Sequence, residues 1–89
     1  MLQVKVLGMG DARHKELGRN MTEALLRCSL DAQLFHVMDV DEIVSHGVTS
    51  IPAILIGEEI FFQNNHLPDT EELTALLKKL LEESNQDAA

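Results

Sequence analysis

The sequence contains one short run, PAILI at residues 52–56, in which nearly every side chain is apolar. A strand of this composition is typical of a sheet covered on both faces, since a strand with one face in water alternates apolar and polar residues. The run therefore predicts an α/β domain in which helices pack against a central sheet.

The other patterned segments predict three more strands and three helices. The strands are expected at residues 2–7, 32–38 and 59–62, and the helices after Asp11 to about Leu30, between Asp39 and Gly47, and after Asp69. The first strand–helix–strand unit makes its two strands parallel, and a hairpin at Gly57 and Glu58 makes the last two antiparallel. The expected architecture is β-α-β-α-β-β-α, a mixed four-stranded sheet flanked by helices.

Length and composition restrict the class of protein. The 89 residues suffice for one small domain, expected over residues 1–83, followed by a frayed C-terminal tail at residues 84–89. The formal net charge of −8 argues against non-specific binding to nucleic acid or to an anionic membrane. The single cysteine, Cys28, allows no intramolecular disulfide and favours a reducing, cytoplasmic setting. The opening MLQVKVLG is typical of a first strand and lacks the features of a signal peptide.

Four local features, taken in order, resemble the small, glutaredoxin-sized thioredoxin-like proteins of the redox-active disulfide type. The first strand runs into Gly8-x-Gly10 and a helix, and DVDEIVSHGVTSIPAILI matches a short helix, a glycine stop and an x-Pro-Ala strand. Gly57 and Glu58 stand at the hairpin, and Pro68 precedes the acidic start of the last helix. The resemblance extends from residue 2 to about residue 81, and it implies the thioredoxin fold.

The resemblance also implies where a ligand would bind. In that family the proline that opens the third strand follows a cis peptide bond, which implies a cis Ile51-Pro52 bond here. The backbone before this proline lies beside the start of the first helix, where it pairs with an extended peptide or a thiol ligand. The implied ligand groove consists of five residues: Gly10, Asp11, His14, Ile51 and Pro52.

The two cysteine positions of the family fall on Asp11 and His14 in this sequence, DARH in place of Cys-x-x-Cys. Disulfide exchange needs an attacking thiolate and a second, resolving thiol, so these residues exclude dithiol oxidoreductase chemistry. Cys28 is no substitute, because it lies 14 residues beyond His14 in the sequence, about 21 Å along one helix. It is expected to be a core cysteine, the alternative being a reactive or intermolecular thiol.

Asp11 and His14 have two interpretations. Asp11 is expected to be an ordinary helix N-cap, and it also puts a carboxylate where the family holds a thiolate. The alternative is an Asp–His pair acting as an acid and base or as two metal ligands, with His66 as a weak further ligand candidate beside His14. The sequence identifies no catalytic residue. It contains no cofactor motif, because Gly8-x-Gly10 lacks the third glycine of a dinucleotide site.

Phe61 and Phe62 follow one another on an expected edge strand. Adjacent strand residues face opposite ways, so one phenylalanine should point away from the main core. With Ile60 it could form a homodimer or partner surface, the alternative being coverage by the last helix or a loop.

The sequence thus favours a redox-inactive binding or accessory module with a possible protein or peptide partner. The alternative is a metal protein or acid–base enzyme centred on Asp11 and His14.

Overall fold

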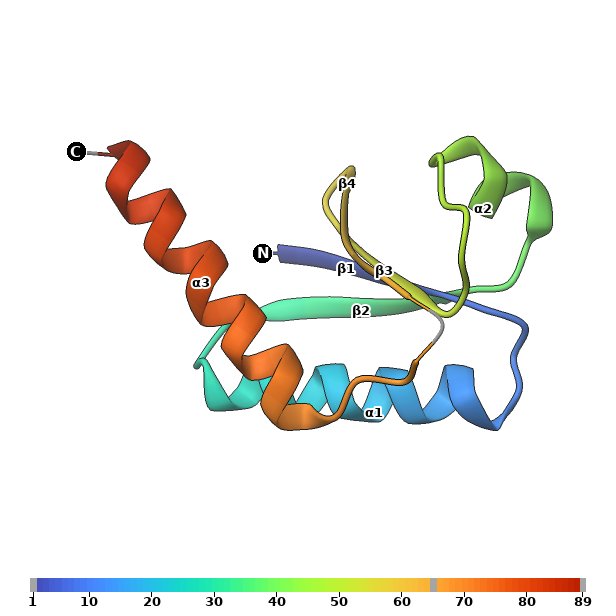
Figure 1. Cartoon of the computed structure of the whole chain (residues 1–89), viewed down its shortest axis with the longest axis horizontal. Helices are drawn as coiled ribbons and strands as arrows, with labels where there is room; N and C mark the ends of the chain where they lie inside the picture. Colours follow the sequence, from blue (N-terminus) through green and yellow to red (C-terminus); the bar gives the residue numbers. More distant parts are fainter. Residues whose placement is uncertain (1, 65, 89) are drawn as a thin grey trace.

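The computed structural model describes the backbone of residues 2–64 and 66–88. It has seven elements (Figure 1): β1 (Leu2–Leu7), α1 (Ala12–Arg27), β2 (Ala32–Val37), α2 (Val40–Ser45), β3 (Ala53–Ile56), β4 (Glu59–Gln63) and α3 (Thr70–Ala88). The strands form one sheet in the order β2-β1-β3-β4, in which β1 pairs parallel with β2 and the other two pairings are antiparallel. The predicted fold class is confirmed.

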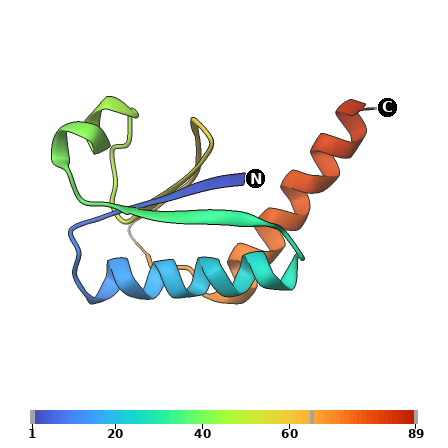
Figure 2. The ribbon, with the colours of Figure 1, turned by 180° about the vertical axis from the view of Figure 1, so that it is seen from behind.

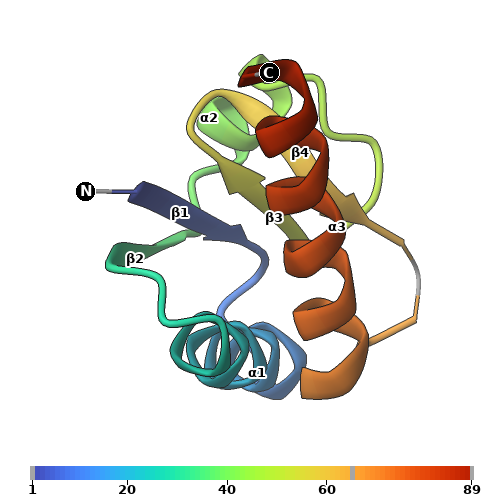
Figure 3. The ribbon, with the colours of Figure 1, turned by 90° about the vertical axis from the view of Figure 1, so that its left-hand side faces the viewer.

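The helices lie in two layers on either side of the sheet. Figures 1 and 2 show α1 on one side of the sheet and α2 on the other, and Figure 3 shows α3 beginning beside α1 and rising obliquely past the strands. The larger core cluster joins the sheet residues Val4, Val6 and Ile54 to buried side chains of α1 and α3. A smaller cluster packs Ile43 of α2 against the opposite face of the sheet.

The run PAILI is buried on both faces, as its composition predicts. Ile54 belongs to the larger cluster, whereas Ala53 and Leu55 belong to the smaller one beneath α2. All three side chains are fully buried, because successive residues of a strand point to opposite faces and both faces are covered here. This central strand holds the adjoining Ile51-Pro52 segment in place.

Helix α1 ends at Arg27, three residues before the predicted limit at Leu30. Ser29 has a left-handed backbone with a φ of 54°, and two backbone hydrogen bonds, Ser29 N–H to Leu26 O and Leu30 N–H to Leu25 O, close the end. These bonds form a Schellman motif. The sequence does not show this end because the left-handed position, most often glycine, is a serine here.

Phe61 and Phe62 do not face opposite ways, which corrects the prediction for this strand. The register between β3 and β4 shifts at Ile54 and Leu55, so that Ile54 pairs with Phe62 and Leu55 with Ile60. Phe61 is thus the extra residue of a β-bulge, and a bulge interrupts the alternation of facing. Both rings pack, partly buried, against the larger core cluster.

The end of the chain was expected to be a frayed tail. In the structure α3 continues to Ala88, the side chains of residues 84–88 are not described, and Ala89 lies outside the described residues. The domain boundary at residue 83 therefore stays a prediction. Among the described residues, no helix combines the length and apolar character that crossing a membrane requires.

Candidate functional site

The turn before α1 and the segment before β3 meet at the same end of the sheet. Gly8, Met9 and Asp11 come from the turn, and Arg13 from the first turn of α1. With Ile51 and Pro52 of the second segment they line a hollow of about 80 Å³. The Ile51-Pro52 peptide bond is cis in the structure. Three residues of the predicted ligand groove, Asp11, Ile51 and Pro52, are therefore neighbours around one small depression.

Gly10 and His14, the other two residues of the predicted groove, line a different hollow. Their neighbours there are Lys15, His36 and Met38, and the volume is about 180 Å³. The structure thus divides the five predicted residues between two depressions that share no lining residue. A ligand in the first depression would reach Asp11 without touching the ring of His14.

Asp11 is the N-cap of α1. Its backbone is extended, with a φ of −83° and a ψ of −175°, and its Oδ1 accepts a hydrogen bond of 3.0 Å from the N–H of His14. An N-cap of this kind stabilises a helix by about 1 kcal/mol relative to alanine. The carboxylate is exposed, so it holds the helix end and also presents a negative charge at the rim of the first depression.

His14 is a buried residue, with 1 % of its surface exposed. The N–H of Gly10 donates to its Nδ1 over 2.9 Å, and its Nε2 lies 2.8 Å from the carbonyl oxygen of Val6 in β1. Because the backbone N–H can only donate and the carbonyl can only accept, the ring is neutral with its proton on Nε2. Both ring nitrogens are engaged by the backbone, and neither is free to bind a metal ion or to exchange a proton with a ligand.

His36, on the edge strand β2, is the partner of His14 that sequence reasoning missed. Its Nδ1 lies 3.0 Å from Nε2 of His14, and the ring centroids are 4.7 Å apart. Since His14 carries its proton on Nε2, this N–H donates to two acceptors, the carbonyl oxygen of Val6 and Nδ1 of His36. His36 as a whole is exposed, but partial desolvation of its ring, and secondarily the neighbouring His14, lower its pKa below the ordinary value of 6.5.

Two glycines make room for this pair of rings. A Cβ on Gly8 would lie 2.7 Å from Cγ of His14, and a Cβ on Gly18 would lie 2.5 Å from Cε1 of His36. Gly18 follows His14 by four positions, so the two lie on one face of α1. A glycine inside a helix was the available signal that another group packs closely against this face.

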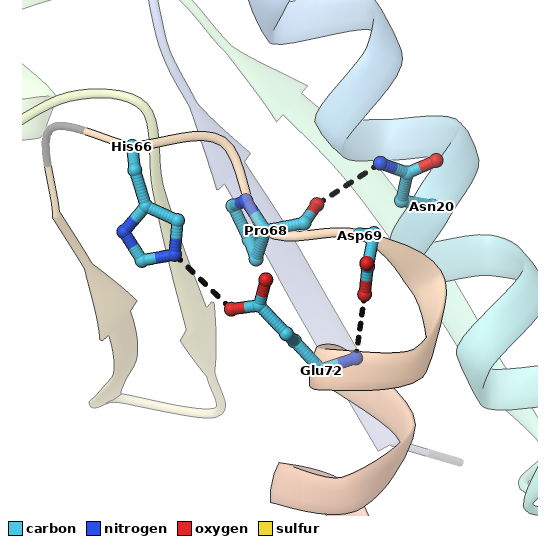
Figure 4. Close-up of polar contacts among 5 residues, drawn as sticks. All are labelled: Asn20, His66, Pro68, Asp69 and Glu72. Atoms are coloured by element: carbon cyan, nitrogen blue, oxygen red, sulfur yellow. Dashed lines mark hydrogen bonds and ion pairs between the residues drawn. The ribbon is translucent and has the colours of Figure 1, made fainter.

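His66 belongs to a separate set of contacts at the start of α3 (Figure 4). Its Nε2 lies 3.1 Å from Oε2 of Glu72, and its ring stands edge-on to Phe62. Beside it, Asn20 of α1 donates to the carbonyl of Pro68, and Asp69 caps α3 by accepting from the N–H of Glu72. His66 therefore helps to fasten the loop to α3 and does not line either depression near Asp11 and His14.

The described residues contain no group of three or more His, Cys, Asp or Glu side chains close enough to hold a metal ion. Cys28 is the C-cap residue of α1 and packs, partly buried, against the larger core cluster. Its Sγ lies 3.9 Å from the carbonyl oxygen of Thr74 in α3. The thiol thus lies at the end of α1 opposite to Asp11.

Comparison with known proteins gives three consistent matches. A family model described as "Thioredoxin domain" matches residues 2–78. A thioredoxin of Methanothermobacter thermautotrophicus is 27 % identical over 60 residues, which cover 67 % of this chain and 78 % of that protein. The structure of thioredoxin 1 from Thermosipho africanus superposes with a TM-score of 0.64 at 14 % identity, covering 93 % of this chain and 98 % of the other.

Proposed function

Because the chain belongs to the thioredoxin domain family and its sequence has a single cysteine, we propose that it binds an extended peptide segment of a partner without dithiol–disulfide chemistry. The observation that carries this proposal is the state of the α1 N-terminus. The two positions that the family resemblance assigns to thiols hold Asp11, which caps the helix, and His14, whose two ring nitrogens are bound by the backbone.

A thiolate at a helix N-terminus is stabilised by the partial positive charge of the helix dipole. The carboxylate of Asp11 lies in the same field and accepts the hydrogen bond of the first turn. It supplies the negative charge but has no sulfur to attack a disulfide. In this proposal the helix end keeps the negative charge of the family's site but has lost the redox step. The proposed setting is a reducing, cytoplasmic one.

The binding surface in this proposal is the hollow bounded by Asp11, Arg13 and the Ile51-Pro52 segment. Its volume of about 80 Å³ suits one small side chain of a peptide and is too small for a whole cofactor. Met9, which is 65 % exposed, adds a flexible apolar contact at its rim. Asp11 and Arg13 supply one charge of each sign for orienting polar groups of the ligand.

A second surface for a partner, or for a second copy of the chain, is the open edge of the sheet at β4. This edge and α3 border a groove of about 280 Å³ that Ile60, Leu76 and Leu80 line with apolar side chains. An unpaired strand edge offers backbone hydrogen bonds to an added strand. The alternative of a metal or acid–base centre on Asp11 and His14 has no such support, since the His14 nitrogens are both engaged.

Selection from phage-displayed random peptides against the intact chain tests the proposal, followed by NMR mapping of a selected peptide. We expect shifts at the amides of Gly8, Met9 and Ile51, and we expect Met9→Ala to weaken binding about fivefold, or about 1 kcal/mol. Met38→Ala is the matched control, because Met38 is also exposed, at 57 %, but lines the other depression. Equal effects of the two substitutions, or no selected peptide at this hollow, would contradict the proposal.

A further inference from the structure

An open depression on the outer side of the molecule lies between α1 and the edge strand β2. Its volume is about 510 Å³, and six residues line it: Lys15, Gly18, Arg19, Thr22, Glu23 and His36. It shares no lining residue with the hollow at Asp11 and Pro52, but it shares Lys15 and His36 with the hollow that Gly10 and His14 line. The proposed peptide site does not make use of it.

The charge of this depression is opposite to that of the molecule. The chain carries a formal net charge of −8, yet the depression holds two cations, Lys15 and Arg19, one helical turn apart. Neither of them forms an ion pair with another described residue. The one carboxylate in the lining, Glu23, lies 3.8 Å from Arg27 and is partly neutralised by it. Like charges at this spacing destabilise a helix by a few tenths of a kcal/mol, so a bound anion would relieve a local repulsion.

His36 adds a hydrogen-bond donor at the inner side of the depression. Its Nδ1 is directed at His14, so the proton of the neutral ring is on Nε2. The ring atoms Cε1 and Nε2 lie over Gly18, where a Cβ would approach them to 2.5 and 2.9 Å. The missing side chain at residue 18 thus lets the imidazole lie against α1, in the depression that Lys15 and Arg19 also line.

We propose that Lys15, Arg19 and His36 form a binding site for a small phosphate-bearing anion. The planar guanidinium of Arg19 can donate two parallel hydrogen bonds to a phosphate, and the ammonium of Lys15 supplies a compact positive charge. The Nε2–H of His36 can donate one further hydrogen bond. The depression is larger than a phosphate group alone requires. It therefore accommodates a phosphomonoester whose organic part lies along α1 towards Thr22.

NMR titration of the intact chain tests this site with two probes, inorganic phosphate and ribose 5-phosphate, at a constant ionic strength set with sodium chloride. We expect saturable shifts at the amides of Lys15, Gly18 and Arg19 and at the imidazole of His36, with the phosphomonoester binding more tightly than phosphate. Equal binding of both probes would assign the site to inorganic phosphate and would still support an oxyanion site. The absence of saturation with both probes would overturn the proposal.

Two double variants separate a built site from general charge. Lys15→Gln with Arg19→Gln is expected to weaken binding at least about tenfold. Lys78→Gln with Lys79→Gln removes the same charge from α3 and is expected to leave binding unchanged. Equal losses in the two double variants would show non-specific attraction and would contradict the site.

The imidazole of His36 gives a second, independent signal. A bound anion favours the charged ring, so saturating phosphate is expected to raise the pKa of His36. The neighbouring His14, Lys15 and Arg19 oppose this rise, whereas the carboxylate of Glu23 favours it. The Lys15 and Arg19 double variant is expected to lose this rise. A pKa of His36 that phosphate leaves unchanged in the native chain would mean that the anion does not bind beside the ring.

Discussion

His14 links three segments: the turn at Gly10, strand β1 and strand β2. Its Nδ1 holds the turn at Gly10, its Nε2 holds the β1 carbonyl of Val6, and its ring lies against His36 of β2. Since buried polar groups that lose their partner are costly, this ring fixes the position of the α1 N-terminus relative to the sheet. The ring of His14 therefore has a structural role, because both of its nitrogens are engaged by the backbone.

Replacing His14 by leucine is expected to destabilise the protein by about 2–4 kcal/mol, because the buried N–H of Gly10 and the carbonyl of Val6 both lose a partner. Urea unfolding followed by circular dichroism measures the change. His46→Gln is the control: His46 lies at the end of α2, outside the core clusters, and its substitution should change the stability by less than about 0.5 kcal/mol. A loss below about 1 kcal/mol for His14→Leu would show that the two hydrogen bonds matter little.

The lowered pKa of His36 makes stability depend on pH. The unfolded chain binds a proton on this ring near pH 6.5, whereas the folded chain binds it only at lower pH. The unfolded state therefore holds more protons in this interval, and stability falls as the pH decreases from 6.5 towards the folded pKa.

Unfolding free energies of the native chain and of His36→Gln, measured between about pH 5.5 and 7.5, isolate this contribution, since the other histidines are common to both proteins. The native chain is expected to show the steeper decline towards low pH. A decline of equal slope in the two proteins would contradict the close contact of the His36 ring with His14.

At the scale of the elements, the helix starts are what the sequence predicts best. Asp11, Asp39 and Asp69 each accept hydrogen bonds from the first turn of the helix that follows. Such caps depend on residues within a few positions of one another, so the sequence alone contains the necessary information. The apolar run of β3 was equally informative because burial on both faces leaves no polar position in the pattern.

The helix end at Arg27 and the bulge in β4 were not predictable in the same way. The first depends on a serine in a left-handed conformation, and the second on a register shift between two strands. The helix end lacks its usual signature, a glycine at the left-handed position, and a bulge has no fixed residue signature at all. Phe61 and Phe62 both reach the core for this reason, although alternation would separate them.

Ser29→Gly is expected to stabilise the protein by about 0.5–1 kcal/mol, because glycine removes the steric cost of the left-handed conformation. The gain is smaller than that steric cost, because glycine also increases the conformational entropy of the unfolded chain. Ser29→Ala keeps a Cβ and is the matched control, with no expected gain. Thermal unfolding of both variants measures the difference. Equal stabilities of the glycine and alanine variants would contradict the Schellman end of α1.

At the scale of the whole molecule, the sequence predicted the sheet and its covering helices, but it did not predict how the candidate site divides. The groove residues Asp11, Ile51 and Pro52 meet, as the family resemblance implies, while His14 turns inward to β1. That inward turn depends on the pairing of Val6 with His36 across the sheet and on the small volumes of Gly8 and Gly18. These contacts join segments that are distant in the sequence, so the residue pattern of any one segment does not predict them.

We propose that this thioredoxin-family domain keeps the fold and a charged α1 N-terminus but carries out no disulfide exchange. The most direct test is the rate of insulin disulfide reduction with dithiothreitol as the electron donor, for the native chain and for Cys28→Ser. We predict the same rate for both proteins as for dithiothreitol alone, because the single thiol lies at the far end of α1 and has no resolving partner in this sequence. A rate above that background, lost in Cys28→Ser, would contradict the claim.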